Sequence, residues 1–180
     1  ILYLCQDHGI PILGRRGCST HVRETCHALQ AAGHEVTILC SRQGDDEDVD
    51  RNLNMVEVSP PRARKLGYDL RNILQNVPFY RKAREIVEST GIDVVYERFS
   101  LYGLAGTWLD RRYRLPRIVE VNAFLTVEQR HKLHFLRLAE MAERRVARRA
   151  PALVVVSQPL LDALVNLGVD RERIFIMPMA

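Results

Sequence analysis

The chain has 180 residues, of which 47% are hydrophobic and 27% charged, and its formal net charge is +4. This composition predicts one globular domain with a sizeable core and excludes an intrinsically disordered chain. No apolar run reaches the roughly 18 residues that a membrane-spanning helix requires, and the initial ILYLC is too short for a signal-peptide core. The sequence therefore predicts a cytoplasmic protein, in which four cysteines without CxxC spacing are reduced and mostly buried.

Apolar runs alternate with helical patterns along the chain. Residues 1–5 predict a first strand, residues 22–32 carry apolar side chains at helical spacing, and Gly33 can end that helix. Further strands are expected at residues 35–40, 54–58, 93–98, 116–122, 152–157 and 173–178, with helices near residues 68–88, 103–112, 126–149 and 159–167. Strands that are apolar on both faces and alternate with helices predict a Rossmann-like α/β domain, a parallel sheet with helices on both faces.

In such a sheet, ligands bind beyond the carboxyl ends of the strands. Residues 14–19, which follow the first strand, do not fit the dinucleotide fingerprint, because the glycines have the wrong spacing and the second strand ends in CSR without a carboxylate for a ribose. This disfavours a nicotinamide-dependent dehydrogenase. Ser19 or Thr20 is expected to cap the following helix, and Gly17 would let a phosphate approach the positive helix end.

The chain carries, in this order, the segments GRRGCSTHVRETCHALQAAGHEVTILC, DVVYERFSLYGLAG, PRIVEVNAF and ALVVVSQPLLDALVNLGVDRERIFIMP. Together they resemble the N-terminal half of retaining glycosyltransferases of the group 1 family, which have the GT-B architecture. The resemblance implies that residues 1–180 form the acceptor-side, Rossmann-like domain, and that a C-terminal nucleotide-sugar-binding domain is absent from this chain. It also implies transfer of a sugar from a nucleotide sugar to an acceptor hydroxyl, with no further cofactor and no turnover by this half alone.

On the donor side, the resemblance points to Gly17, Cys18 and Asn122. Gly17 matches the second glycine of a pair whose loop approaches the donor phosphate, although Arg16 replaces the first. Asn122 lies where many relatives place a histidine close to the transferred sugar. An amide cannot transfer a proton, so Asn122 is expected at most to orient a hydroxyl or a carbonyl group.

On the acceptor side, the resemblance points to His21, Glu97, Arg98 and Glu128. For each residue a structural alternative stays open. His21 could simply pack at the helix start, Glu97 and Arg98 could form a structural ion pair, and Glu128 could cap a helix or lie on the surface. No catalytic base can be assigned in this half.

Two patterns raise the question of a metal site. An EF-hand-like spacing occurs at Asp46, Asp48, Asp50 and Glu57. Arg51, however, stands where that loop requires glycine. A second set, which could share one face of the helix expected at residues 126–149, consists of Glu128, His131 and His134. Strands rather than helices flank the first set, and we interpret the second set as solvated side chains, so no metal is expected.

Basic residues concentrate in the segments PPRARK, RKAR and ERRVARRA. Few aromatic residues accompany them, so nucleic acid is not an expected partner. The expected partners are a nucleotide sugar, a sugar or lipid-linked acceptor and, through residues 60–84 and 137–149, an anionic membrane at its inner face. A solvated helix face is the alternative for these segments. A non-catalytic binding module is the alternative function, and a nucleotide-sugar epimerase of the same architecture is a third.

Overall fold

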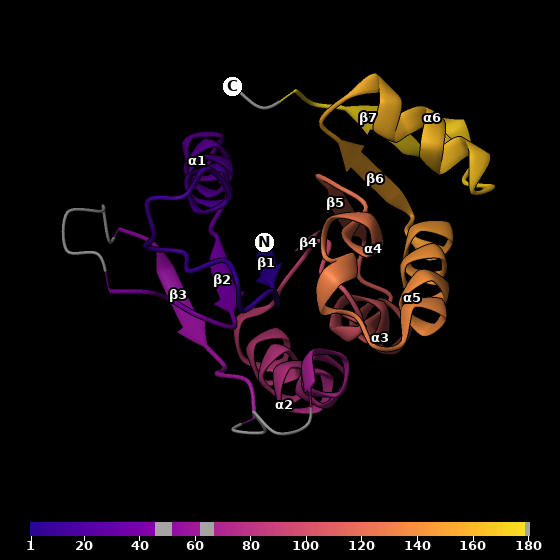
Figure 1. Cartoon of the computed structure of the whole chain (residues 1–180). Helices are drawn as coiled ribbons and strands as arrows, with labels where there is room; N and C mark the ends of the chain where they lie inside the picture. Colours follow the sequence, from indigo (N-terminus) through magenta and orange to yellow (C-terminus); the bar gives the residue numbers. More distant parts are fainter. Residues whose placement is uncertain (46–51, 62–66, 179–180) are drawn as a thin grey trace.

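A computed structural model describes residues 1–45, 52–61 and 67–178 (Figure 1). Seven strands in these ranges form one parallel sheet in the order β3-β2-β1-β4-β5-β6-β7. The strands are β1 (Leu2–Cys5), β2 (Thr37–Cys40), β3 (Asn54–Glu57), β4 (Val95–Arg98), β5 (Arg117–Val121), β6 (Ala152–Val155) and β7 (Ile174–Ile176). The strand order reverses between β1 and β4, as it does in doubly wound sheets. The predicted Rossmann-like fold is confirmed.

Six α-helices occur in the described ranges, with two short 3-10 turns. They are α1 (Gly17–Ala31), α2 (Gly67–Thr90), α3 (Ala105–Tyr113), α4 (Leu125–Glu128), α5 (Leu136–Arg149) and α6 (Gln158–Asn166), and the turns are η2 (Arg130–Lys132) and η3 (Arg171–Arg173). Gly33 has a φ of +91°, so it supports the predicted end of α1 by adopting a backbone conformation that other residues rarely take.

The single helix predicted over residues 126–149 is wrong, because this stretch is divided into α4, η2 and α5. The division has a local cause. The buried Glu143, in the middle of α5, accepts a hydrogen bond of 2.8 Å from the backbone N–H of Leu125 and another from the hydroxyl of Thr126. These bonds fasten the start of α4 to α5, so the chain must turn back between them. Glu128 and His134 consequently do not lie on one helix.

Different helices cover the two faces of the sheet (Figure 1). On one face, α1 packs against the side chains of Tyr3 and Cys5 in β1. On the other face, α2 and α3 pack against Leu2 and Leu4 of the same strand. α5 and α6 complete a further apolar cluster with β5 and β6. Burial of these alternating side chains stabilises the layers and fixes which loops meet at the carboxyl edge of the sheet.

The EF-hand-like pattern and the first basic segment lie partly outside the described residues. The acidic residues of the EF-hand-like pattern at positions 46, 48 and 50 lie outside the described residues, as do residues 62–65 of the basic segment PPRARK. Within the described part of the chain, no group of three or more histidine, cysteine or acidic side chains is arranged to hold a metal ion. In the same ranges, none of the helices combines the length and the apolar character that crossing a bilayer requires.

Candidate functional site

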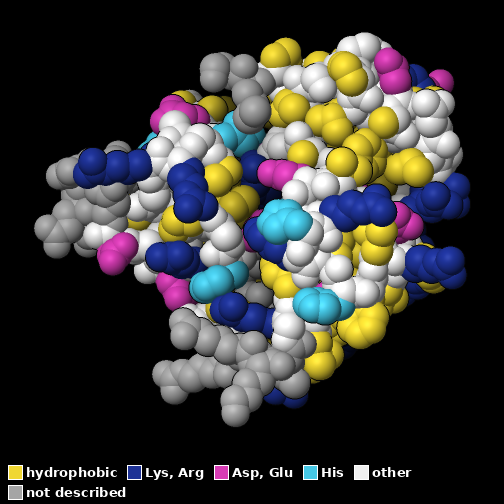
Figure 2. All heavy atoms as spheres, in the orientation of Figure 1, with side chains coloured by type: hydrophobic (Ala, Val, Ile, Leu, Met, Phe, Trp, Pro, Cys, Tyr) yellow, Lys and Arg dark blue, Asp and Glu magenta, His cyan; other side chains and the backbone are white. Residues whose placement is uncertain are grey.

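A pocket of about 450 Å³ opens where the strand order reverses. Its walls come from the segments that follow β1, β4 and β5, from the start of α1, from one side of α2, and from α4 and η2. In the space-filling view, Lys, Arg and His side chains gather around the hollow between these elements (Figure 2). The loops diverge at such a reversal, so this edge is where a doubly wound sheet leaves room for a ligand.

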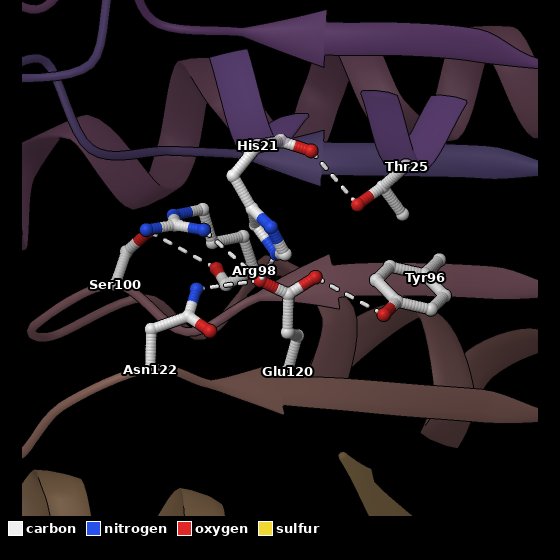
Figure 3. Close-up of polar contacts among 7 residues, drawn as sticks. All are labelled: His21, Thr25, Tyr96, Arg98, Ser100, Glu120 and Asn122. Atoms are coloured by element: carbon white, nitrogen blue, oxygen red, sulfur yellow. Dashed lines mark hydrogen bonds and ion pairs between the residues drawn. The ribbon is translucent and has the colours of Figure 1, made fainter. Parts of the chain in front are cut away.

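Glu120 of β5 is the centre of a polar network beside this pocket (Figure 3). Its Oε1 accepts hydrogen bonds from Arg98 Nη1 at 2.9 Å and from Asn122 Nδ2 at 2.5 Å, and it lies 2.8 Å from His21 Nε2. Its Oε2 accepts a hydrogen bond from the Tyr96 hydroxyl at 3.0 Å. One buried carboxylate therefore fixes side chains from α1, from β4 and from the end of β5.

The charges in this network are matched despite their burial. Burial opposes ionisation of Glu120, but the hydrogen bond from His21 and the positive charge of Arg98 outweigh it and hold the pKa of the carboxyl below its usual value. Burial also opposes the charged form of Arg98, yet the neighbouring Glu120 carboxylate raises the pKa of its guanidinium. Glu120 and Arg98 are thus both charged at neutral pH.

In the described structure, the amide of Asn122 has a hydrogen-bond partner for its NH2 group but none for its carbonyl oxygen. The NH2 group donates to Glu120, which sets the orientation of the side chain. The carbonyl Oδ1 has no hydrogen-bond partner within the described residues, and Asn122 lines the pocket. A buried acceptor without a partner is costly, so this oxygen is suited to a hydroxyl donor on a ligand.

The start of α1 lacks a side-chain cap. The predicted cap at Ser19 or Thr20 is wrong, because the helix begins two residues before Ser19, at Gly17, and Arg16 occupies the N-cap position without a side-chain hydrogen bond. Ser19 is fully buried inside the first turn. The Ser19 N–H donates to the carbonyl of Arg16, whereas the N–H groups of Gly17 and Cys18 have no hydrogen-bond partner among the described residues. These two groups and the positive end of the helix dipole are therefore available to an anion.

Glu97 does not belong to this pocket. Successive residues of a strand point to opposite faces, so Glu97 faces α3 while Arg98 faces α1. Glu97 Oε2 accepts a hydrogen bond from Arg117 Nη1 at 2.8 Å, and both side chains are buried. Burial raises the pKa of Glu97, although the charge of Arg117 counteracts it. The ion pair suggested between Glu97 and Arg98 is replaced by two separate pairs with residues of β5.

The structure brings together most of the other residues singled out in the sequence. Those that line the pocket are Cys18, Arg98, Asn122 and Glu128. Gly17 directly precedes Cys18, and His21 reaches the network through Glu120 rather than lining the pocket. Sequence reasoning missed Glu120 itself, although an acid within the run IVEV, two residues before Asn122, is a usable signal. It also missed Arg71 of α2, whose contribution depends on which side of the helix faces the pocket.

The chain is similar to known proteins in sequence and in structure. Residues 16–180 match the model of the glycosyl transferase 4-like domain. No protein with a curated description matches the chain. Sucrose-phosphate synthase from Thermosynechococcus elongatus is similar in structure with a TM-score of 0.72 and 16% sequence identity, over 98% of this chain and 47% of the synthase. Anabaena HepE, solved in complex with UDP-glucose, has a TM-score of 0.69 and 14% identity, over 98% of this chain and 43% of HepE.

The UDP-N-acetylglucosamine 2-epimerase from Rickettsia bellii is also similar, with a TM-score of 0.61 and 12% identity over 97% of this chain and 43% of the epimerase. The chain thus spans less than half the length of each of these three structures. At such identities the structural likeness establishes the fold alone, whereas the family model extends over nearly the whole chain. The chain therefore belongs to the glycosyl transferase 4-like family and has the Rossmann-like fold of the N-terminal half of a GT-B glycosyltransferase.

Proposed function

We propose that this chain is the acceptor-side half of a retaining glycosyltransferase, which transfers a sugar from a nucleotide sugar to an acceptor hydroxyl. The observation that carries the proposal is that two groups without a hydrogen-bond partner among the described residues meet at one pocket. These are the uncapped start of α1 next to Cys18 and the unpartnered carbonyl of Asn122. The first suits a phosphate, and the second suits a sugar hydroxyl.

The start of α1 would face the diphosphate of the donor. A Cβ atom added at Gly17 would meet nothing within 4 Å, so the fold itself does not require glycine at this position. Glycine instead leaves room for a phosphate to approach the backbone. Positive potential at this point would stabilise the charge that develops on the leaving diphosphate when the glycosidic bond breaks.

The Glu120 network would hold the side chains that meet the transferred sugar. Asn122 would accept a hydrogen bond from a sugar hydroxyl, since an amide positions groups but does not transfer protons. Arg98 is fixed by Glu120 and lines the pocket, where it would bind oxygen atoms of a substrate. The contribution of this half is therefore orientation, which lowers the entropic barrier to reaction.

The test uses the natural protein that carries this chain. UDP-, GDP- and ADP-linked sugars are incubated with it, and release of the nucleoside diphosphate is measured with and without a panel of acceptor sugars. We expect one donor class to be cleaved, and NMR of the product to show that the anomeric configuration is retained. We expect Asn122→Ala to lower turnover about tenfold, which corresponds to the loss of one hydrogen bond of about 1 to 1.5 kcal/mol.

The matched control is Asn166→Ala, which changes an exposed asparagine at the end of α6, outside the pocket. Its turnover should equal that of the unchanged protein. Binding of a nucleotide sugar without any cleavage would favour the non-catalytic binding module. Inversion of the anomeric configuration would reject the retaining mechanism, and interconversion of two nucleotide sugars would favour an epimerase.

A peripheral contact with an anionic membrane is proposed for the same protein, on the strength of the surface at α5. Phe135, Leu138 and Met141 are exposed there, with exposed Arg137 and Arg144 beside them. Apolar side chains next to arginines are suited to the boundary between lipid headgroups and acyl chains.

This contact predicts co-sedimentation of the natural protein with phosphatidylglycerol vesicles at low salt, and much weaker co-sedimentation with phosphatidylcholine vesicles. Replacement of Leu138 and Met141 by serine should reduce the bound fraction. Val165→Ser, which changes an exposed apolar residue on α6, should leave it unchanged. Failure to bind phosphatidylglycerol vesicles would contradict the membrane contact and favour a solvated face of α5.

A further inference from the structure

Arg71 of α2 is a half-buried cation at the wall of the pocket. It lines the pocket, yet within the described part of the chain it forms neither a hydrogen bond nor an ion pair. Asp7 and Glu128 line the same pocket, and neither carboxylate forms an ion pair with it. Placing a guanidinium partly out of water without a directly bonded counter-ion is unfavourable. A fold that keeps such a group in a pocket holds it ready for a ligand.

A second cation lies at the same end of the pocket. Tyr68 precedes Arg71 by three residues on α2, so the two side chains lie on the same side of the helix. Lys132 Nζ of η2 lies 5.9 Å from the centre of the Tyr68 ring, and the Tyr68 hydroxyl donates to Gln129. These contacts bring Lys132 toward the side of α2 from which Arg71 enters the pocket.

This end of the pocket is separate from the start of α1. α1 and α2 cover opposite faces of the sheet (Figure 1). Cys18 of α1 and Arg71 of α2 both line the pocket, so the two walls that they belong to come from opposite faces. A donor whose diphosphate lies at the start of α1 leaves Arg71 and Lys132 to the second substrate. A ligand at the start of α1 and a ligand at Arg71 and Lys132 would therefore be different molecules.

We propose that Arg71, together with Lys132, forms a subsite for an acidic group on the acceptor, either a phosphate or a carboxylate. The inference rests on the proposed transferase function and adds the chemical class of the acceptor. The planar guanidinium matches two oxygens of a phosphate or a carboxylate, and the ammonium group of Lys132 adds charge without a fixed geometry. An uncharged sugar offers no counter-ion for Arg71, so the subsite selects acidic acceptors over neutral ones.

The experiment measures binding by isothermal titration calorimetry with the natural protein that carries this chain. The nucleoside diphosphate of the cleaved donor is kept saturating, so that anionic probes cannot bind at the start of α1. Three matched probes are titrated: glucose, glucuronate and glucose 6-phosphate. We expect one or both acidic sugars to bind roughly 10- to 100-fold more tightly than glucose, as a charged hydrogen-bonded group does. Glucuronate and glucose 6-phosphate distinguish a carboxylate from a phosphate.

The variant Arg71→Gln should remove this preference, whereas Arg81→Gln should keep it. Arg81 is exposed on the same helix, outside the pocket, and without a partner in the described structure, so it controls for the loss of one positive charge. Equal binding of all three probes, or a preference that survives Arg71→Gln, would overturn the subsite. Hydrolysis of the donor without acceptor is measured on the same samples. If the unchanged protein cleaves no donor, it is the proposed transferase function that has failed.

Discussion

Arg98 and Glu120 are direct neighbours across β4 and β5, and their side chains form an ion pair with 2.9 Å between Nη1 and Oε1. Both side chains are buried, and the same carboxylate oxygen also binds Asn122. The pair therefore joins the packing of the sheet to the orientation of a pocket side chain. A change in either residue is expected to affect both stability and ligand binding.

Glu120→Gln tests this double role. The amide cannot neutralise Arg98, so a buried charge remains without its partner, and we expect a loss of about 3 kcal/mol in the free energy of unfolding. Urea denaturation measures that loss. The double variant Arg98→Met with Glu120→Leu removes both charges and should recover most of the stability without recovering sugar transfer. If the double variant transferred sugar normally, the pair would have a structural role only.

The stability of the protein should fall at acid pH through Glu120. The folded state holds the pKa of this carboxyl below its usual value of 4.5. Its stabilising contribution is therefore complete above that value and is lost as the pH falls through the lower folded-state pKa. Thermal melts between pH 3 and pH 7 should show a smaller loss of stability at acid pH for Glu120→Gln than for the unchanged protein. Parallel curves would contradict the assignment.

Two glycines should respond differently to the same substitution. A Cβ atom at Gly106 would lie 2.7 Å from the carboxyl carbon of Glu97 and 3.1 Å from Arg117 Cδ, whereas one at Gly17 would contact nothing within 4 Å. We expect Gly106→Ala to destabilise the fold by about 2 to 4 kcal/mol through overpacking of a buried ion pair. Gly17→Ala should leave the stability nearly unchanged.

The same Gly17→Ala variant should weaken donor binding. The added methyl group would occupy the space through which a phosphate approaches the start of α1. Urea denaturation measures the stability of both glycine variants, and donor KM measures the second effect. An unchanged donor KM for Gly17→Ala would place the diphosphate elsewhere.

Cys18 should be the most reactive thiol. It is half-buried in the pocket wall, while the other three cysteines are buried. Burial raises the pKa of Cys26 and of Cys40 to about 12 and also raises that of Cys5, so few thiolates form at these positions. Iodoacetamide at pH 7.5 should modify Cys18 first, as mass spectrometry of the peptides would show, and the donor nucleotide should slow that reaction. Equal labelling of all four cysteines would contradict this burial pattern.

The sheet and most helices were predictable because the spacing of apolar residues along the chain follows from which side chains are buried. All seven strands and the limits of α2 and α6 lie close to the expected ranges. The break between α4 and α5 was not predictable from local pattern, because it depends on Glu143, a residue within the amphipathic helix that bonds to a segment 17 and 18 residues away. The start of α1 was misplaced for a related reason. Cap preferences describe the residues that usually cap the start of a helix, whereas the start of α1 has no side-chain cap.

The candidate site was predictable in part. Residues directly after strands, such as Arg98 and Asn122, meet at one edge because parallel strands bring their carboxyl ends together. The sequence did not show to which face of the sheet each strand side chain points. Glu97 points to the face opposite to that of Arg98, and it therefore does not reach the pocket. Arg71 carried no local signal, because its position depends on how α2 turns toward the pocket.

The two ion pairs between β4 and β5 lie on opposite faces of the sheet. The strand that supplies the acidic side chain differs between the two pairs. On one face β4 supplies the acid, Glu97, to Arg117, and on the other β4 supplies the base, Arg98, to Glu120. If these strands paired one residue out of step, Arg98 would face an aliphatic neighbour instead of Glu120, and both charges would be buried without compensation. During folding, the side chains that border the pocket therefore also select a single alignment of its central strands.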